Sequence, residues 1–228
     1  MIPRRQILTD ETYDSIMSLL MNHQVQPGER INIDALSRML GVSVTPVRET
    51  LARLESEGLV TKQALVGYTA TPLLTLQQLS DMYEVRLALE PLAARQAALR
   101  SSQEQVDQIA ATVGGGRASP RGTRSDEHLL VALDDERFHA AIAQAARNDF
   151  LRDAVDRLHS HLHLYRLYQN AKVVQEATLH EHDAIVEALR RRDADAAEQQ
   201  MRAHLEASRD RLVDVVRRSS DAPGVGAS

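Results

Sequence analysis

Three histidines and one aspartate have the residue types and the spacing of a metal site. Asp135 and His139 are four residues apart in a segment with helical periodicity, so they share one face of a helix. His182 and His204 lie in two later helical segments. Facing helices of a bundle can bring such residues together around a divalent cation, with one oxygen ligand, three imidazole ligands and open positions for water or a small molecule.

Nine histidines in a helical chain also produce such combinations by chance. In the alternative interpretation these histidines are hydrogen-bonded core residues and the aspartate is a cap or a pairing partner, and spacing alone supports both interpretations equally. A second cluster, His159, His161 and His163, has no acidic partner at a fixed position, and we interpret it as helix surface or pocket lining. His180 precedes His182 by two residues and must point elsewhere.

Another group of residues has the pattern of a DNA-binding helix-turn-helix. The segment ALSRMLGVSVTPVRETLARLESEGLV begins at Ala35, and Gly41 lies where the chain turns sharply and a left-handed backbone costs nothing. Hydroxyl and backbone N–H groups around Ser43 and Thr45 can hold a phosphate, and Arg48, one turn further on, can reach a guanine edge. The inner faces of both helices are apolar at Leu36, Leu40, Val42, Val47, Leu51 and Leu54.

These residues have a plainer alternative. In a helical interaction domain, Ser43 and Thr45 would be caps and Arg48 would pair with neighbouring glutamates, but the cap, the glycine, the core spacing and a following hairpin would then agree by accident. Arg53 is as consistent with a solvated charge near a glutamate as with a DNA contact.

The elements that position these residues are mostly helices, because Trp is absent and aromatic residues make up only 3% of the chain. Two short β-prone runs, 59–61 and 67–70, predict a hairpin. From residue 75 onward, short loops between helical segments predict an antiparallel bundle. Helices are predicted over residues 9–21, 34–40, 43–57, 75–99, 102–113, 125–146, 149–169, 174–191 and 193–218.

Three segments are therefore expected: a winged helix-turn-helix domain at 1–72, a helical domain at 75–218 and a disordered tail at 219–228. Pro72 marks the boundary between the two domains. The stretch GGGRASPRGTRS at 114–125 is predicted to be a mobile loop.

Charge and composition limit the function. The net charge is −5, and residues 1–72 hold seven Lys and Arg against eight Asp and Glu, so phosphate contacts must come from a few placed arginines. Without Cys there are no disulfides and no thiolate metal ligands. No signal peptide and no apolar stretch of membrane-spanning length is present, so we expect a soluble, cytoplasmic protein.

The segment LGVSVTPVRETLARLESEGLV resembles the signature of the GntR family of bacterial regulators, with PGERI as its turn and GY as its wing tip. The resemblance implies that Ser43, Thr45 and Arg48 contact operator DNA and that Gly67 lets the wing approach the minor groove. Val44 departs from the family pattern, which most often has a DNA-contacting arginine there, so one contact is lost and the preferred operator can differ.

The segments DMYEVRLALEPLAARQAA, DDERFHAAIAQAARNDFL and EHDAIVEALRRRDADAAEQQMRAHL are similar to the FCD ligand-binding domain of the FadR subfamily, over about 75–218. Many members of that subfamily hold a metal with an Asp-x3-His pair and one histidine from each of the last two helices. Asp135, His139, His182 and His204 fall on those positions. The resemblance implies a divalent metal, which we expect to be zinc or nickel, anchoring a small carboxylic acid.

Arg86 and Asn148 are the expected additional effector-binding residues. Arg86 lies near the middle of the first bundle helix, and Asn148 is expected to line the same cavity. Each has an alternative of equal weight, since Arg86 can pair with Glu90 and Asn148 can cap the helix that starts at Asp149.

The sequence thus predicts a homodimeric transcription regulator that changes its operator affinity when a metal-held organic acid enters the helical domain. Dimerisation follows because a palindromic operator needs two recognition helices related by a two-fold axis. A metal sensor, in which the ion itself is the signal, is the alternative. We do not expect an enzyme, because no general base is placed near the metal ligands and an enzyme would not need residues 35–61.

Overall fold

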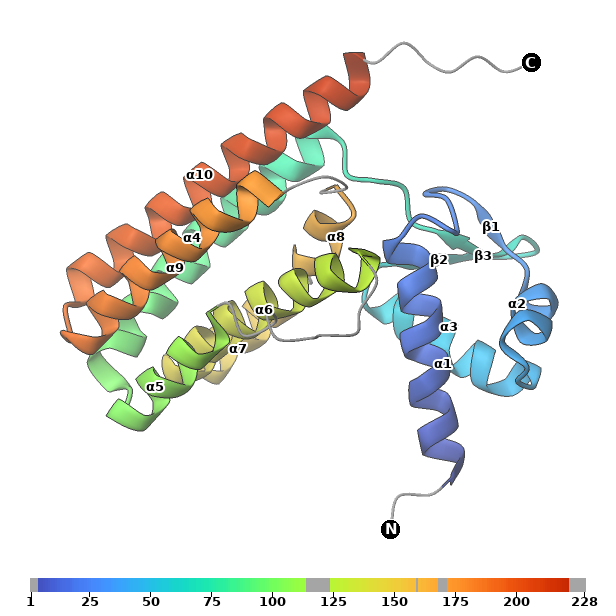
Figure 1. Cartoon of the computed structure of the whole chain (residues 1–228), viewed down its shortest axis with the longest axis horizontal. Coiled ribbons are helices and arrows are strands. Elements are labelled where there is room, and N and C mark those ends of the chain that lie inside the picture. The colour runs from blue at the N-terminus through green and yellow to red at the C-terminus, as the bar shows by residue number, and fades with distance from the viewer. Residues whose placement is uncertain (1–3, 114–123, 159, 168–171, 222–228) are drawn as a thin grey trace. The chain divides into compact units, whose positions relative to one another are not determined.

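The computed structural model describes residues 4–113, 124–158, 160–167 and 172–221 (Figure 1). The chain divides into two compact units, residues 1–73 and 74–228, each with its own buried apolar core. Helices dominate both units and one small sheet lies in the first, which confirms the predicted fold class. Within the described ranges, no helix is both long and apolar enough to cross a membrane.

The first unit is built on three helices, α1 (Arg4–Met21), α2 (Ile33–Leu40) and α3 (Val44–Ser56). Asn32 caps α2, because its side chain accepts a hydrogen bond from the backbone N–H of the first turn. Gly41 ends α2 with a φ of 67°, the left-handed conformation that the tight turn into α3 requires. The buried core of the helices includes Ile16, Leu20, Leu36, Val47, Leu51 and Leu54.

A three-stranded antiparallel sheet completes this unit, in the order β1-β3-β2. The predicted hairpin is β2 (Val60–Gln63) and β3 (Gly67–Ala70). The strand β1 (Arg30–Ile31) was not predicted. Two residues carry no alternating pattern, and β1 exists only through its pairing with β3, about 40 residues further along the chain.

The second unit contains seven helices among its described residues. The long helix α4 packs against α10, which also contacts α9, while α6 contacts α4, α5, α7 and α8 (Figure 1). Capping boxes start α4 and α5, at Thr75 with Gln78 and at Ser102 with Gln105. The helices are α4 (Leu76–Arg100), α5 (Gln103–Thr112), α6 (Arg124–Ala145), α7 (Asp149–Asp156), α8 (Ser160–Tyr165), α9 (Lys172–Arg190) and α10 (Ala194–Asp221).

Two expectations about this unit were wrong in part. The single helix predicted over 149–169 is divided into α7 and α8, since α7 ends at Asp156 with Arg157 as its C-cap and α8 begins at Ser160. The helix α10 continues to Asp221, into the expected disordered tail. Most of the expected loop at 114–125 and the remainder of that tail lie outside the described residues.

Candidate DNA-binding surface and metal centre

The N-terminal turn of α3 presents the three predicted DNA contacts to solvent. Ser43 is at the N-cap position, but its side chain makes no capping hydrogen bond. Thr45 and Arg48 are also exposed, and Arg48 forms no ion pair with any described residue. Among the described residues, therefore, Ser43 does not act as a side-chain cap and Arg48 does not pair with a glutamate, which were the alternatives considered above.

Arg53 has a structural role. Its Nε lies 3.1 Å from a carboxylate oxygen of Glu57, and its guanidinium lies 3.7 Å from the centre of the Tyr13 ring. The Tyr13 hydroxyl donates a 2.7 Å hydrogen bond to the same glutamate. These contacts join α1 to α3, so Arg53 is engaged within the unit.

The wing turns between β2 and β3. Gly67, at the start of β3, has a φ of +96°, which side-chain-bearing residues rarely adopt. No atom lies within 4 Å of the place where a Cβ would be, so the backbone conformation, and not crowding, requires glycine. Leu65 at the tip is fully exposed, and its φ is also positive.

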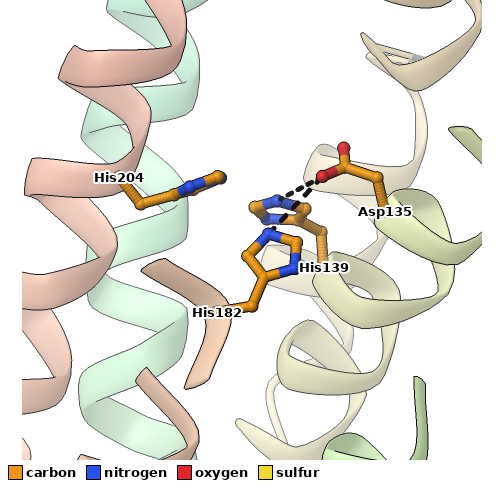
Figure 2. A group of neighbouring side chains, drawn as sticks. All are labelled: Asp135, His139, His182 and His204. Carbon is orange, nitrogen blue, oxygen red and sulfur yellow. Dashed lines mark ion pairs between the residues drawn. The ribbon is translucent and has the colours of Figure 1, made fainter. Parts of the chain in front are cut away.

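The four predicted metal ligands converge from three helices of the second unit. Asp135 and His139 come from α6, His182 from α9 and His204 from α10, and all four point into one space (Figure 2). One possible ligand atom from each lies within 4.8 Å of the other three. The three histidines are buried and Asp135 is partly exposed.

The geometry of this cluster fits a cation better than mutual hydrogen bonding. Oδ1 of Asp135 lies 3.8 Å from Nε2 of His139 and 3.5 Å from Nε2 of His182, and both nitrogens are buried without a hydrogen-bond partner. Buried polar atoms left unpaired are costly, and a shared ion would satisfy them. Ligand atoms around a tetrahedral zinc ion lie about 3.4 Å apart. The widest candidate pair, up to 4.8 Å apart, would therefore have to close by roughly 1.4 Å around such an ion.

The imidazoles are held from their outer side by acidic residues. Nδ1 of His139 lies 2.6 Å from Oε2 of Glu90, whose other oxygen accepts a 2.6 Å hydrogen bond from Nε of Arg86. Nδ1 of His204 lies 2.8 Å from Oε2 of Glu181. Arg211 donates two hydrogen bonds, of 2.6 and 2.8 Å, to that glutamate. Neither glutamate–histidine contact was predicted from the sequence, in which Glu90 was considered only as a partner of Arg86.

His182 is held differently. Its ring stacks on Phe138, with the ring centres 3.8 Å apart and the planes 16° from parallel. Phe138 directly precedes His139 on α6, so one turn of that helix supplies both a ligand and the surface that orients another ligand.

Burial and charge set the protonation of the cluster. Burial lowers the pKa of His182 well below its ordinary value and also lowers the pKa of His204. Burial alone would raise the pKa of Asp135, but the surrounding histidines and Arg86 lower it overall. The pKa of Glu181 is lowered to about 2, since hydrogen bonds from Arg211 and His204 outweigh burial. Neutral imidazoles beside an ionised carboxylate are the forms that bind a metal.

A cavity of about 130 Å³ opens beside the cluster on the Asp135 side. None of its described lining residues is Lys or Arg, and two more carboxyl groups face it besides Asp135. The described lining residues are Asp135, Glu136, His139, Ala140, Val155, Asp156 and Ser160.

The two expected effector-binding residues occupy different places. Arg86 is buried on α4 next to the cluster, where Nε and Nη2 both face Glu90. Asn148 caps α7, since its side chain accepts a hydrogen bond from the backbone N–H of Leu151, and it is not among the described residues of the cavity. Both local alternatives are thus present, and the effector roles stay predictions.

The remaining histidines lie outside the cluster as far as they are described. His180 is exposed on α9, two residues before His182. His163 is half-buried on α8, His161 lies on the same helix, and His159 falls outside the described residues. Their interpretation as surface or pocket lining stays a prediction.

Comparison with known proteins matches both units. Residues 8–69 match the family described as bacterial regulatory proteins, gntR family, and residues 81–207 match the FCD domain. The chain is 30% identical over 229 residues to the putative L-lactate dehydrogenase operon regulatory protein of Escherichia coli (strain K12), covering 90% of this chain and 85% of that protein. It is 27% identical over 197 residues to the HTH-type transcriptional regulator YdhC of Bacillus subtilis (strain 168), covering 84% and 85%.

The solved structure of Escherichia coli McbR/YncC has a similar fold, with a TM-score of 0.68 at 19% identity over 97% of this chain and 100% of that one. A winged helix-turn-helix joined to such a helical unit defines a DNA-binding transcription regulator. The chain belongs to the GntR family of bacterial regulators and carries an FCD domain. The matched families and relatives are regulators, not enzymes, as the sequence predicted.

Proposed function

We propose that this regulator binds a palindromic operator as a homodimer and that a small organic acid, held by a metal ion in the FCD domain, controls its operator affinity. The observation that carries the proposal is the buried cluster of one carboxylate and three imidazoles within an FCD domain. Three of its imidazole nitrogens, both of His139 and Nε2 of His182, have no hydrogen-bond partner. This pairing of domains also favours the FadR subfamily, and DNA binding implies a cytoplasmic location.

In this proposal the metal is bound by Asp135, His139, His182 and His204. One oxygen and three imidazole nitrogens suit a divalent zinc or nickel ion. With neutral imidazoles, Asp135 is the only charged ligand, so a divalent ion retains one net positive charge. When bound, the ion supplies a Lewis acid that can hold a carboxylate oxygen of the effector.

The cavity beside the cluster suggests why the effector would need the ion. Its described lining is acidic, at Asp135, Glu136 and Asp156, and would repel a carboxylate by itself. Arg86 is proposed as a second cation for the acid, through the Nη1 atom that does not face Glu90. Asn148 is retained as a proposed effector contact, although its side chain caps α7. The lactate dehydrogenase operon named for one relative concerns a small carboxylic acid, the same class of molecule.

DNA binding is assigned to Ser43, Thr45, Arg48 and Gly67. The first three lie exposed at the start of α3, where backbone N–H groups also favour a phosphate, and Gly67 gives the wing its backbone shape. Half-buried Val44 offers no polar group to DNA, so hydroxyls, amides and Arg48 carry the contacts.

Dimerisation is proposed from the two-fold symmetry of a palindromic operator, and α4 offers a surface for it. Val85, Leu92 and Leu99 are 43%, 42% and 58% exposed. They are spaced by seven residues, about two helical turns, so they form one apolar stripe on the outer side of α4. A second copy of the chain would bury this stripe.

The proposal is tested by metal analysis of the purified protein, together with mass spectrometry of any small acid that co-purifies. We expect about one equivalent of zinc or nickel per chain and an acid that is lost when the metal is chelated. Protein that acquires no metal from a solution of Zn²⁺ would contradict the proposal. Operator binding that responds to metal alone, without acid, would favour the metal-sensor alternative.

A further inference from the structure

We propose that two arginine–glutamate pairs, Arg86 with Glu90 and Arg211 with Glu181, are positioning devices that fix the tautomer of two metal-binding histidines. Each glutamate would hold one imidazole as its Nδ1–H form and turn Nε2 toward the metal. This inference rests on the metal site proposed above. It assigns a function to four residues outside the ligand set.

The first arm runs through α4. Glu90 is almost completely buried, and its Oε1 and Oε2 receive Nε and Nη2 of Arg86 at 2.6 and 3.4 Å. Oε2 also lies 2.6 Å from Nδ1 of His139. The contact is a close ion pair and not an aligned hydrogen bond. A carboxylate paired with arginine has no proton to donate, so this close approach favours the proton on Nδ1 of His139. The lone pair of that imidazole is then on Nε2, which faces the cluster.

The second arm repeats this chemistry with other helices. Nη1 and Nη2 of Arg211 on α10 donate hydrogen bonds of 2.6 and 2.8 Å to the two carboxylate oxygens of Glu181 on α9. Oε2 of that glutamate is also 2.8 Å from Nδ1 of His204. The order of groups is again arginine, carboxylate, imidazole Nδ1. Two of the three histidines are therefore oriented by the same device, although the glutamates come from different helices.

The arginines explain how acidic residues can support the site without adding net charge. Each arginine–glutamate pair is neutral as a whole, so the pairs orient the ligands and leave the charge of the site to Asp135 and the ion. His182 shows no such carboxylate contact among the described interactions and is oriented by stacking on Phe138. The site thus combines two ligands held by carboxylates with one stacked ligand.

The primary test is Glu181→Gln, because Glu181 and Arg211 are partly exposed and the variant leaves no fully buried charge. An amide replaces one carboxylate oxygen by an NH₂ donor and carries no charge, so it cannot accept all three hydrogen bonds that Glu181 receives from Arg211 and His204, and it stabilises the Nδ1–H form of His204 less. In metal-free protein labelled with ¹⁵N at histidine, we expect the NMR signals of His204 to change from the Nδ1–H tautomer in the wild type to a mixed or Nε2–H form. Co²⁺ affinity, measured by chelator competition, should fall about 10- to 100-fold, with a shifted visible Co²⁺ spectrum.

Glu198→Gln is the matched control, since Glu198 on α10 also pairs with arginines but contacts no histidine among its described interactions. Its Co²⁺ affinity should stay within about twofold of the wild type. Glu90→Gln is the second variant. Its readout is the tautomer of His139 from the NMR signals, and a circular dichroism spectrum must first show that the variant is folded. An unchanged tautomer with unchanged Co²⁺ affinity in Glu181→Gln would overturn this inference while leaving the metal site intact. Wild-type protein that binds no Co²⁺ would overturn both.

Discussion

Arg48 owes its proposed role to its position, one turn into α3 and exposed, with no acidic partner among the described residues. Arg53, five residues further on, is chemically identical but is held by Glu57 and by the ring of Tyr13. The two arginines could not be separated by the sequence pattern, because the partner from α1 lies 40 residues away in the chain. The environment, and not the residue type, assigns their roles.

Replacing Arg48 by Ala should weaken specific operator binding by about 1–3 kcal/mol, because a base or phosphate contact is removed while the fold is untouched. The measurement is fluorescence anisotropy with a duplex obtained by selection from a random library. Arg191→Ala, which removes the same charge from the second unit, is the control and should bind as the wild type does. Equal affinity for both variants would remove Arg48 from the recognition surface.

His182→Ala and His204→Ala should each weaken metal binding enough for a chelator to remove the ion, because each variant deletes one of the four ligands. The readout is metal content after dialysis against Zn²⁺ and then against a weak chelator. His180→Ala is the control: this exposed histidine lies on the same helix, two residues before His182. Metal retained by the first two variants, or lost by the third, would mean that the ligands are assigned wrongly.

Acid should destabilise the metal-free protein in a specific pH window. Burial holds the pKa of His182 and of His204 below the ordinary value of 6.5, so below that pH the unfolded chain binds more protons than the folded one. The free energy of unfolding should therefore fall from pH 7 to pH 5, by about 1.4 kcal/mol for each unit of pKa difference. Urea denaturation measures it, and His182→Ala should show a shallower fall. Parallel curves for variant and wild type would contradict this account.

At the scale of elements, the sequence predicted the features that depend on neighbouring residues, namely helix positions and shared helix faces. Helical periodicity and caps predicted nearly all helices, and the four-residue spacing predicted that Asp135 and His139 share a face of α6. The convergence of α9 and α10 on that face depends on packing between distant segments, so from the residues alone it remained one of two interpretations. The resemblance to the FCD domain, and not the spacing, favoured it.

The contacts of Glu90 with His139 and of Glu181 with His204 were not predicted, because they also depend on packing between distant segments. Glu181 directly precedes His182 in the sequence but contacts His204, 23 residues further on. Glu90 was considered only as a partner of Arg86, because the four-residue helix spacing is visible and the contact to His139 is not. A weak signal was available: Arg211 follows His204 by seven residues and therefore shares its helix face.

The stripe on α4 gives a prediction at this scale. A double substitution, Leu92→Glu with Leu99→Glu, places two negative charges in an apolar surface and should shift the protein from dimer to monomer, as measured by analytical ultracentrifugation. Gln200→Glu, which adds a charge at an exposed site on α10, should remain dimeric. A double variant with the dimeric mass of the wild type would exclude the stripe as the dimer interface.

For the whole molecule, effector binding in the FCD domain and operator binding in the helix-turn-helix domain are proposed to share one equilibrium between two arrangements of the dimer. The effector has to bind one arrangement of the dimer more tightly than another, and a coupling of about 1–3 kcal/mol is typical of such regulators. By the same linkage, operator DNA must change the affinity for the effector by an equal factor. Because the described lining of the cavity is acidic, the effector should act only when the ion is present.

The most direct test is the operator affinity of chelated protein in three states: without addition, with Zn²⁺ or Ni²⁺ alone, and with the metal together with the acid that co-purifies. The account predicts an affinity change of roughly 5- to 150-fold only in the third state, with no change for His204→Ala. Equal operator affinity in all three states would contradict the claim that a metal-held acid controls this regulator.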